Sequence, residues 1–504
     1  MNLIETFQPS LRGRADKPAL WFGDRWYTFG ELDRQSDAVA HALVNDYGVG
    51  RGDRVSMFLG NCPELIVFYL AGLKTGAIVV PINILYRDRE LTHLLTDAEP
   101  RVLLCDPQRF EVLAPLRHQF DALEQIFVTG AETPATTRGF GELTESVPDT
   151  PLSVAGITAD DPALMIYTSG TTGRSKGALL THHNLVSNIV TLLQCWQWTA
   201  ADRFLLALPM FHIHGLGNGL HGALASGCTT FLLPRFHADT ASELLRREKC
   251  TLFFGVPTMY ERLLEHADAD GAVPADMRLY VSGSAPLSPD TFARFKTVFG
   301  HEILERYGMS ETAMITSNLY AGPRVQGSVG KPLPGVSVRI VDEAGVSVAD
   351  DETGEIQLRG PNVLKEYWRQ PEKTVEAFQD GWFRTGDLGR YDAQENIIIC
   401  GRAKELIISG GFNIYPQEII NCLVDHAGVV EAAVIGVPDQ RRGELPKAYV
   451  VAAEPVPTEA ELTAYCTAQL ASFKVPKRIV FLDALPRNAM GKLQLQNLPE
   501  RDCI

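Results

Sequence analysis

Short apolar runs alternate with longer amphipathic stretches along the first part of this chain, and this alternation constrains the fold more than any other feature. The runs "RVSMFLG", "AIVVPI", "RVLLC" and "EQIFVTG" have the length and the apolar character of buried strands. Helix-length patterns lie between such runs, and Thr28 and Glu31 form a capping-box pattern before one of them. Strands that alternate with helices predict an α/β fold of parallel sheets covered by helices.

The pattern changes from about Gly335. The segments "GVSVRIVDEAG", "GEIQLRG" and "ENIIICGR" are short alternating strands with turn residues between them, which predicts a small antiparallel or β-barrel-like portion. After "GRAKELIISGG" the chain has a βα pattern of its own, typical of a small α+β domain. We therefore predict a large N-terminal domain over residues 1–402 and a small, mobile C-terminal domain over residues 403–504.

Composition narrows the classes of partner and compartment. The formal net charge is −15, so the molecule as a whole repels nucleic acid and anionic membranes, and we expect neither as a partner. The nine cysteines are scattered without a CxxC pair, which indicates reduced thiols. The apolar window Leu65–Ile82 is broken at Lys74–Gly76, which predicts a buried helix followed by a buried strand. The N-terminus does not resemble a secretory signal, so we expect a soluble, cytoplasmic protein.

The stretch "MIYTSGTTGRSKG" at residues 165–177 is rich in small and hydroxyl residues and contains one lysine near its end. Such a loop allows close approach of backbone N–H groups and hydroxyls to phosphate oxygens. It does not match the P-loop pattern, because Lys176 lacks a preceding glycine and is followed by Gly177. On its own the stretch is either another kind of phosphate loop or a flexible surface loop.

Six further stretches follow it in order: "PMFHIHG", "VSGSAPL", "ERYGMSET", "FRTGDLG", "GRAKELIISGG" and "PRNAMGK". In this order and spacing they resemble the acyl-adenylate-forming superfamily, which contains acyl-CoA synthetases, amino-acid adenylation domains and firefly luciferase. The resemblance covers essentially the whole chain. It implies a ligase that joins a carboxylate to AMP, releases pyrophosphate and then transfers the acyl group to a thiol, with ATP and coenzyme A as substrates.

The resemblance also implies positions for the nucleotide. The residues that would hold the ATP phosphates are Thr168, Ser169, Gly170, Thr171, Thr172, Gly173 and Lys176. Those that would line the adenine and the rest of the nucleotide are Gly283, Ser284, Ala285, Glu305, Arg306, Tyr307, Gly308, Met309 and Ser310. Asp387 would accept hydrogen bonds from the ribose hydroxyls, and Arg402 would reach the ribose or the phosphates.

Magnesium and catalysis are implied in the same way. Glu311 would be the Mg²⁺ ligand, with Thr172 beside it, because the cation prefers hard oxygen donors. Lys492 would bridge the carboxylate and the α-phosphate during adenylation. Lys404 occupies the position about which the small domain would rotate between the two half-reactions.

Coenzyme A would enter beside the glycine-rich segment that begins at Ser409. Its small residues would leave room for the slender pantetheine arm, with a turn at a strand edge as the alternative. The predicted CoA-binding residues are Ser409, Gly410, Gly411 and Phe412.

The acid substrate is predicted from a closer resemblance to malonyl-CoA synthetases, carried by "WQWT", "FHIHGL", "FFGVPTMYERL", "RLYVSGSAPL" and "FLDALPRNAMGK". A second carboxylate needs a cation, and Arg235 and Arg278 match the positions that hold it in that branch. A salt bridge at a strand start is the alternative for Arg278. His212 and Met309 would line the acyl pocket, with His212 also counted as catalytic. His214, like His212, either gates the pocket or is merely packed.

Malonate or a 2-substituted malonate is therefore the predicted acid. A short or medium monocarboxylic acid is the alternative substrate. An amide-forming acyl-adenylate synthetase and a non-catalytic nucleotide-binding protein are the alternative classes.

Overall fold

The structure is a computed structural model. It describes residues 1–130, 133–145, 150, 152, 156–168, 175–270, 273–409, 412–439, 442–470, 472–488 and 491–499. The chain forms two compact units, one of residues 1–337 with 359–381 and one of residues 338–358 with 382–504. The second unit thus includes residues 338–358 and 382–402, which the sequence assigns to the N-terminal domain. The domain boundary after Arg402 stays a prediction.

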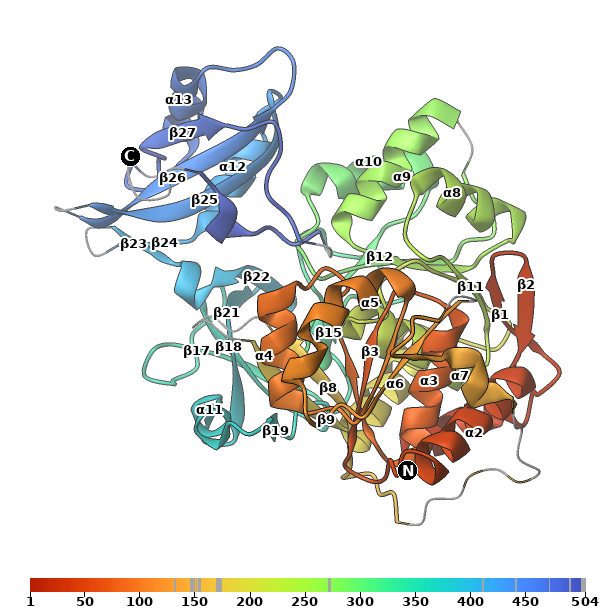
Figure 1. Cartoon of the computed structure of the whole chain (residues 1–504). Coiled ribbons are helices and arrows are strands. Elements are labelled where there is room, and N and C mark those ends of the chain that lie inside the picture. Colours follow the sequence, from red (N-terminus) through yellow and green to blue (C-terminus); the bar gives the residue numbers. More distant parts are fainter. Residues whose placement is uncertain are drawn as a thin grey trace. The chain divides into compact units, whose positions relative to one another are not determined.

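The first unit contains an eight-stranded sheet with the order β19-β9-β8-β4-β3-β5-β6-β7 (Figure 1). Its strands are β3 (Arg54–Phe58), β4 (Ile78–Pro81), β5 (Val102–Cys105), β6 (Gln125–Val128), β7 (Arg138–Gly139), β8 (Pro162–Thr168), β9 (Lys176–Thr181) and β19 (Glu366–Tyr367). The four predicted strands are β3 to β6, and they pair in parallel, which confirms the α/β prediction. The pairs β8–β9 and β9–β19 are antiparallel.

The second sheet of this unit has nine strands in the order β16-β15-β14-β13-β12-β10-β11-β1-β2. They are β1 (Pro18–Phe22), β2 (Arg25–Thr28), β10 (Arg203–Leu206), β11 (Thr229–Leu232), β12 (Leu252–Gly255), β13 (Leu279–Ser282), β14 (Leu304–Met309), β15 (Ala313–Ser317) and β16 (Lys331–Pro332). The strands from β1 through β11, β10, β12 and β13 to β14 are parallel, and the outer pairs are antiparallel.

Helices cover these sheets and supply the core. They are α1 (Leu3–Leu11), α2 (Phe29–Asn45), α3 (Pro63–Thr75), α4 (Asp88–Ala98), α5 (Pro107–Leu113), α6 (His182–Cys195), α7 (His221–Ser226), α8 (Ala238–Arg247), α9 (Pro257–Asp270), α10 (Pro289–Phe299) and α11 (Pro371–Glu376). Short elements are η1 (Ala114–Gln119), η2 (Phe140–Thr144), the π-helical η3 (His214–Leu220) and β20 (Phe378–Gln379). Leu94 of α4 and Phe110 of α5 pack in one cluster with the eight-stranded sheet, and α8, α9 and α10 pack against the nine-stranded sheet (Figure 1).

Two local predictions are confirmed in this unit. Thr28 and Glu31 form the capping box of α2, in which the side chain of each bonds the backbone N–H of the other. The apolar window is helix α3 followed by strand β4, and Gly76 ends the helix with a φ of 75°, which glycine adopts without strain. No helix in the described part of the chain is long and apolar enough to cross a membrane.

The second unit holds two smaller sheets. In the first, β18 (Gly354–Arg359) pairs with β21 (Trp382–Tyr391), which pairs with β22 (Ile397–Arg402), both antiparallel as the sequence predicts, and β17 (Ser337–Val341) lies beside β18. The second has the order β24-β23-β26-β25 with β27 paired to β26. Its elements are η4 (Ala403–Glu405), β23 (Ile407–Ser409), β24 (Phe412–Ile414), α12 (Pro416–Val424), β25 (Val429–Asp439), β26 (Gly443–Ala452), α13 (Glu459–Gln469), β27 (Arg478–Phe481) and η5 (Leu495–Asn497).

Two buried histidines lie among the helices of the first unit. Nδ1 of His182 accepts the Leu3 N–H at 3.2 Å, so this ring is held as the neutral form. Nε2 of His221 lies 2.7 Å from the hydroxyl of Tyr69. Burial lowers the pKa of His182 to about 4 and that of His221 to about 3.

These histidines predict a loss of stability in mild acid. The unfolded chain, with a histidine pKa of about 6.5, binds more protons than the folded chain between that pH and the folded pKa. The stabilisation is therefore complete above about pH 6.5 and is lost as pH falls. From pH 7 to pH 5, His182 alone should cost about 2 kcal/mol.

Urea unfolding at the two pH values tests this expectation by comparing variants. The comparison is needed because burial raises the pKa of Glu305 to about 7, and this group acts in the opposite direction. His182→Gln should flatten the pH dependence, whereas the exposed His118→Gln should leave it unchanged. Equal pH dependence in wild type and His182→Gln would contradict the assignment.

Candidate active site

The β8–β9 hairpin carries the loop in which the sequence predicts a phosphate site. Thr168 at the end of β8 is the antiparallel partner of Lys176 at the start of β9, so two of the predicted phosphate ligands lie side by side. The other predicted loop residues lie outside the described residues: Ser169, Gly170, Thr171, Thr172 and Gly173.

Glu311, the predicted magnesium ligand, lies against this hairpin. Its Oε1 accepts hydrogen bonds from Thr168 Oγ1 and from the hydroxyl of Tyr367, each at 3.2 Å. Its backbone carbonyl accepts the Leu364 N–H at 2.7 Å, and the residue is only 7% exposed. The fold thus brings the predicted metal ligand to the first residue of the predicted phosphate loop, 143 positions earlier in the sequence.

The oxygen chemistry around Glu311 fits Mg²⁺. This cation is usually held by one or two carboxylates together with substrate phosphates and water. The described residues contain no group of three or more acidic, His or Cys side chains that could hold a metal ion. Glu311 would be its protein carboxylate, with the hydroxyl of Thr168 beside it. Bound Mg²⁺ would neutralise charge on the phosphate oxygens.

The small-residue segment after β13 meets the motif on β14. Ser282 is the parallel partner of Glu305, and Gly283 therefore lies beside Arg306. A Cβ built on Gly283 would lie only 2.4 Å from Cζ of Arg306, so a larger residue would displace the guanidinium. Ser284 has a φ of 71°, a strained value for a residue other than glycine. Ala285, which follows it, is half-buried.

Arg306 is the most unusual side chain of this region. It is 5% exposed, and its Nε and Nη2 have no hydrogen-bond partner among the described residues. Burial lowers its pKa to about 9, and the nearby Tyr260 acts against that shift. A buried guanidinium with two nitrogens that lack hydrogen-bond partners is costly, and an anionic ligand could satisfy both nitrogens.

His214 lies in the same cluster. Its Nδ1 is 3.2 Å from Ser284 Oγ, and its backbone N–H donates to Nδ1 of His212 at 3.2 Å. Burial lowers the pKa of His214 far below its usual range, and the charges of Arg306 and His212 lower it further. His214 is therefore neutral at pH 7. It begins the π-helical segment η3, a distortion often found at functional sites.

The rest of the β14 motif forms a tight turn into β15. A Cβ on Gly308 would lie 2.0 Å from the carbonyl oxygen of Ala313, so the two strands approach closely here. Tyr307, Met309 and Ser310 are half-buried. Burial raises the pKa of Glu305, whereas the N–H groups of Gly327 and Leu287 lower it. Glu305 thus ties two loops together, and its contact with the nucleotide stays a prediction.

In the second unit, the predicted ribose, hinge and catalytic residues lie together. Nε of Arg402 is 3.1 Å from Oδ1 of Asp387, on paired strands. Desolvation lowers the pKa of Lys492, Arg402 lowers it further, and Asp387 raises it. Desolvation and Arg402 likewise lower the pKa of Lys404, which lies in η4. The charges of these residues are close enough to shift the pKa values of the two lysines. The role of each residue in binding the ribose, in the hinge or in catalysis stays a prediction.

The predicted coenzyme A segment begins at the end of β23. Ser409 is buried and pairs with Phe412 at the start of β24 and with Gly443 of β26. Gly410 and Gly411 lie outside the described residues. Ser409 and Phe412 thus belong to paired antiparallel strands, and contact of the segment with coenzyme A stays a prediction.

Comparison with known proteins agrees with this arrangement. Residues 7–368 match the family described as AMP-binding enzyme, and residues 418–492 match the AMP-binding enzyme C-terminal domain. The chain belongs to the AMP-binding enzyme family. Its family and its relatives show that it is an AMP-forming acyl-CoA ligase.

The relatives of this AMP-binding enzyme differ in their acids. The long-chain-fatty-acid–CoA ligase of Bacillus subtilis (strain 168) is 33% identical, over 97% of this chain and 92% of the relative. The malonate–CoA ligase of Arabidopsis thaliana is 31% identical, over 99% and 88%. The crystal structure of ATP-bound MatB from Rhodopseudomonas palustris is 40% identical, with a TM-score of 0.89 over 98% of each chain. Family membership therefore fixes the reaction class and leaves the acid open.

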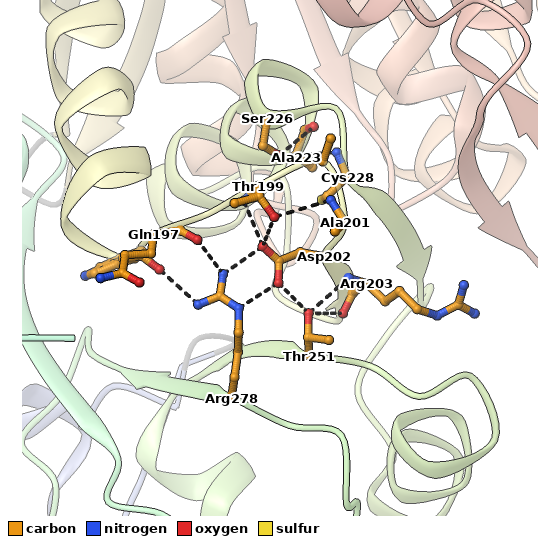
Figure 2. Close-up of polar contacts among 12 residues, drawn as sticks. Gln197, Thr199, Ala201, Asp202, Arg203, Ala223, Ser226, Cys228, Thr251 and Arg278 are labelled. Atoms are coloured by element: carbon orange, nitrogen blue, oxygen red, sulfur yellow. Dashed lines mark hydrogen bonds and ion pairs between the residues drawn. The ribbon is translucent and has the colours of Figure 1, made fainter. Parts of the chain in front are cut away.

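Arg278, one of the two predicted acid-binding residues, forms hydrogen bonds to other residues of the protein. Nε and Nη2 bond the two carboxylate oxygens of Asp202, each at 2.7 Å, and Nη1 and Nη2 donate to the carbonyls of Trp196 and Gln197, as Figure 2 shows for the labelled partners. Its guanidinium also lies over the ring of Tyr320. These four bonds leave no pair of N–H groups for a substrate carboxylate. The salt bridge, the alternative interpretation, is what the AMP-binding enzyme contains.

We expect Arg278→Met to affect stability rather than selectivity. Burial alone would raise the pKa of Asp202, but hydrogen bonds from Arg278 and Thr251 more than offset it, and the net pKa is lowered. Removing Arg278 leaves this 4%-exposed carboxylate without its main partner, which should cost about 3 kcal/mol in urea unfolding. The ratio of kcat/KM for malonate over butyrate should stay as in wild type. A selective loss of malonate turnover would restore Arg278 as a substrate ligand.

Arg235, the other predicted clamp, lies after β11. Its side chain is exposed, and in the described residues it has no ion pair. An exposed arginine is strongly hydrated, so it offers little of the desolvated binding energy that a selective clamp needs. Arg235 follows the carboxyl end of β11 and Arg278 precedes the amino end of β13, so the parallel strands between them place the two arginines at opposite edges of the sheet.

Three residues of the site carry no clear signal in the sequence. Tyr367 lies on a strand of only two residues, too short to predict. His93 of α4 places Nε2 2.8 Å from the Ser175 carbonyl, next to the phosphate loop, through a contact that only packing creates. Asp202 is 76 positions from Arg278. Asp202 lies just before the short strand β10, and nothing in that local pattern indicates Arg278 as its partner.

Proposed function

We propose that this enzyme activates malonate or a 2-substituted malonate, forming an acyl-AMP and then an acyl-CoA thioester. The observation that carries the proposal is the buried guanidinium of Arg306, with two nitrogens unpartnered among the described residues. A second carboxylate on the acid would satisfy them through two parallel hydrogen bonds. The similarity to a malonate–CoA ligase supports the same acid class.

This proposal moves the anion site from the predicted Arg235 and Arg278 to Arg306. The neutral imidazole of His214 and the hydroxyl of Ser284 lie in the same cluster and can bond the acid without adding charge. Nε2 of His214 has no partner in the described part of the chain and would donate or accept there. A monocarboxylic acid would leave the Arg306 charge buried and unsatisfied, which would disfavour its binding.

In the first half-reaction, a carboxylate oxygen attacks the α-phosphorus of ATP and pyrophosphate leaves. Thr168 and Lys176 would hold the leaving phosphates, and Lys492 would place its positive charge between the two reacting groups. In the second, the sulfur of coenzyme A attacks the acyl carbon and AMP leaves. Asp387 would keep the ribose in place, and movement about Lys404 would exchange Lys492 for the Ser409 segment.

Product analysis tests this reaction. With ATP, Mg²⁺, coenzyme A and malonate, we expect equal amounts of malonyl-CoA, AMP and pyrophosphate. Omitting coenzyme A should stop turnover after formation of enzyme-bound acyl-AMP. Product formation with an amine in place of coenzyme A would instead indicate an amide-forming synthetase, and nucleotide binding without acid-dependent pyrophosphate release would indicate a non-catalytic protein.

A further inference from the structure

Tyr367 contacts two residues of the predicted phosphate and magnesium site. Its hydroxyl donates to Oε1 of Glu311 at 3.2 Å, and Nζ of Lys176 lies 4.8 Å from the centre of its ring. The second contact is a cation–π interaction, in which the ring face attracts the ammonium group. One side chain therefore contacts the predicted metal ligand and the predicted phosphate lysine.

The backbone fixes Tyr367 in this place. It is the antiparallel partner of Ala178 on strand β9, the strand that begins at Lys176. On either side of it, Lys365 N–H donates to the Leu179 carbonyl at 2.9 Å and Trp368 N–H donates to the Gly177 carbonyl at 2.8 Å. The short strand β19 is therefore held to the hairpin on both sides of the tyrosine.

The same segment also holds the backbone of Glu311, since the Leu364 N–H bonds its carbonyl. Tyr367 is 7% exposed, and its hydroxyl acts as a donor to the Glu311 carboxylate. A neutral donor orients the carboxylate while leaving its charge for another ligand.

We propose that Tyr367 is a positioning residue for adenylation, which fixes the Glu311 carboxylate through its hydroxyl and the Lys176 ammonium through its ring. The inference rests on the proposed role of Glu311 and Lys176 in holding Mg²⁺ and the ATP phosphates. Tyr367 itself touches neither group. The hydroxyl contact can be removed alone, because Phe keeps the ring, whereas Leu removes both contacts.

The first experiment separates the hydroxyl from the ring. Tyr367→Phe should raise the Mg²⁺ concentration needed for half-maximal pyrophosphate release by about tenfold, as expected for loss of a hydrogen bond to a charged group. Calorimetric binding of ATP should weaken in the presence of Mg²⁺ and change little in its absence. Tyr367→Leu should also weaken ATP binding in the absence of Mg²⁺, because Lys176 then loses its contact with the aromatic ring.

The matched control is Tyr167→Phe. Tyr167 lies on β8 next to Thr168, but its hydroxyl donates to Asp97 Oδ2 at 2.5 Å and not to Glu311. This variant should lower stability with unchanged Mg²⁺ dependence. All three variants should convert supplied malonyl-AMP and coenzyme A to malonyl-CoA at the wild-type rate, a result that general unfolding would not produce.

The outcomes distinguish this inference from the proposed function. Wild-type Mg²⁺ dependence in both Tyr367→Phe and Tyr367→Leu, with a large loss in Glu311→Gln, would overturn the positioning role alone. Wild-type Mg²⁺ dependence in Glu311→Gln would overturn the metal assignment itself. Equal loss in both half-reactions for Tyr367→Phe would show a structural role and would also overturn the inference.

Discussion

Lys492→Ala should lose most acyl-AMP formation, by about 100-fold or more, while still converting supplied malonyl-AMP and coenzyme A to thioester. The reason is that a charge placed between two anionic reactants matters only while they approach. The lowered pKa of Lys492, caused by desolvation and by Arg402, adds a second expectation. Adenylation needs the protonated lysine, so it should decline with rising pH before the usual lysine pKa of 10.5 is reached.

Single-turnover assays of each half-reaction check this split. Lys477→Ala provides a control, because the ammonium group of this exposed lysine of the same unit donates only to the Ser472 carbonyl, at 3.5 Å, among its described contacts. It should leave both half-reactions unchanged. Parallel loss of both half-reactions in Lys492→Ala would remove the lysine from a role specific to adenylation.

Arg306→Met should reduce kcat/KM for malonate by about 100-fold or more, since a desolvated charge pair that loses one partner costs about 2–5 kcal/mol. Butyrate, which has no second carboxylate, should be used as well as before or better. Because Nε and Nη2 of the buried guanidinium have no partner among the described residues, its replacement should also raise the melting temperature. A more stable protein with a selective loss of malonate turnover cannot be explained by unfolding.

The measurement is steady-state pyrophosphate release for both acids, with melting temperature recorded for each variant. Arg278→Met is the matched control, since it removes the same chemical group from a salt bridge with Asp202. It should lower stability and leave the malonate preference intact. Equal harm to malonate and butyrate in Arg306→Met would exclude Arg306 as the selective group.

The sequence predicts the framework of this molecule well, because the framework depends on local patterns. The apolar runs at β3 to β6 are largely buried, and their alternation with helix-length stretches predicts parallel strands. The resemblance to a family of known chemistry predicts Thr172 beside Glu311, and the structure shows Thr168 of the same segment in contact with Glu311. Nothing in the pattern of either segment alone predicts their distance.

The roles of the arginines could not be predicted from the sequence. The sequence predicts Arg278 as a substrate ligand. In the fold, however, its guanidinium bonds Asp202 and the carbonyl of Trp196. Arg306 lies in a motif assigned to the nucleotide, and its burial without partners in the described residues depends on Gly283 and on strand pairing. Packing decides whether an arginine bonds other residues of the protein or can bind a substrate, so the sequence alone does not predict which of the two occurs.

The central claim, that the acid carries a second carboxylate, is tested most directly by the ratio of kcat/KM for malonate over butyrate in the wild-type enzyme. Pyrophosphate release with saturating ATP, Mg²⁺ and coenzyme A gives both values under one condition. The buried Arg306 predicts a ratio of about 100 or more, as expected for a desolvated charge pair. A ratio near or below one would contradict the claim and would make a monocarboxylic acid the substrate.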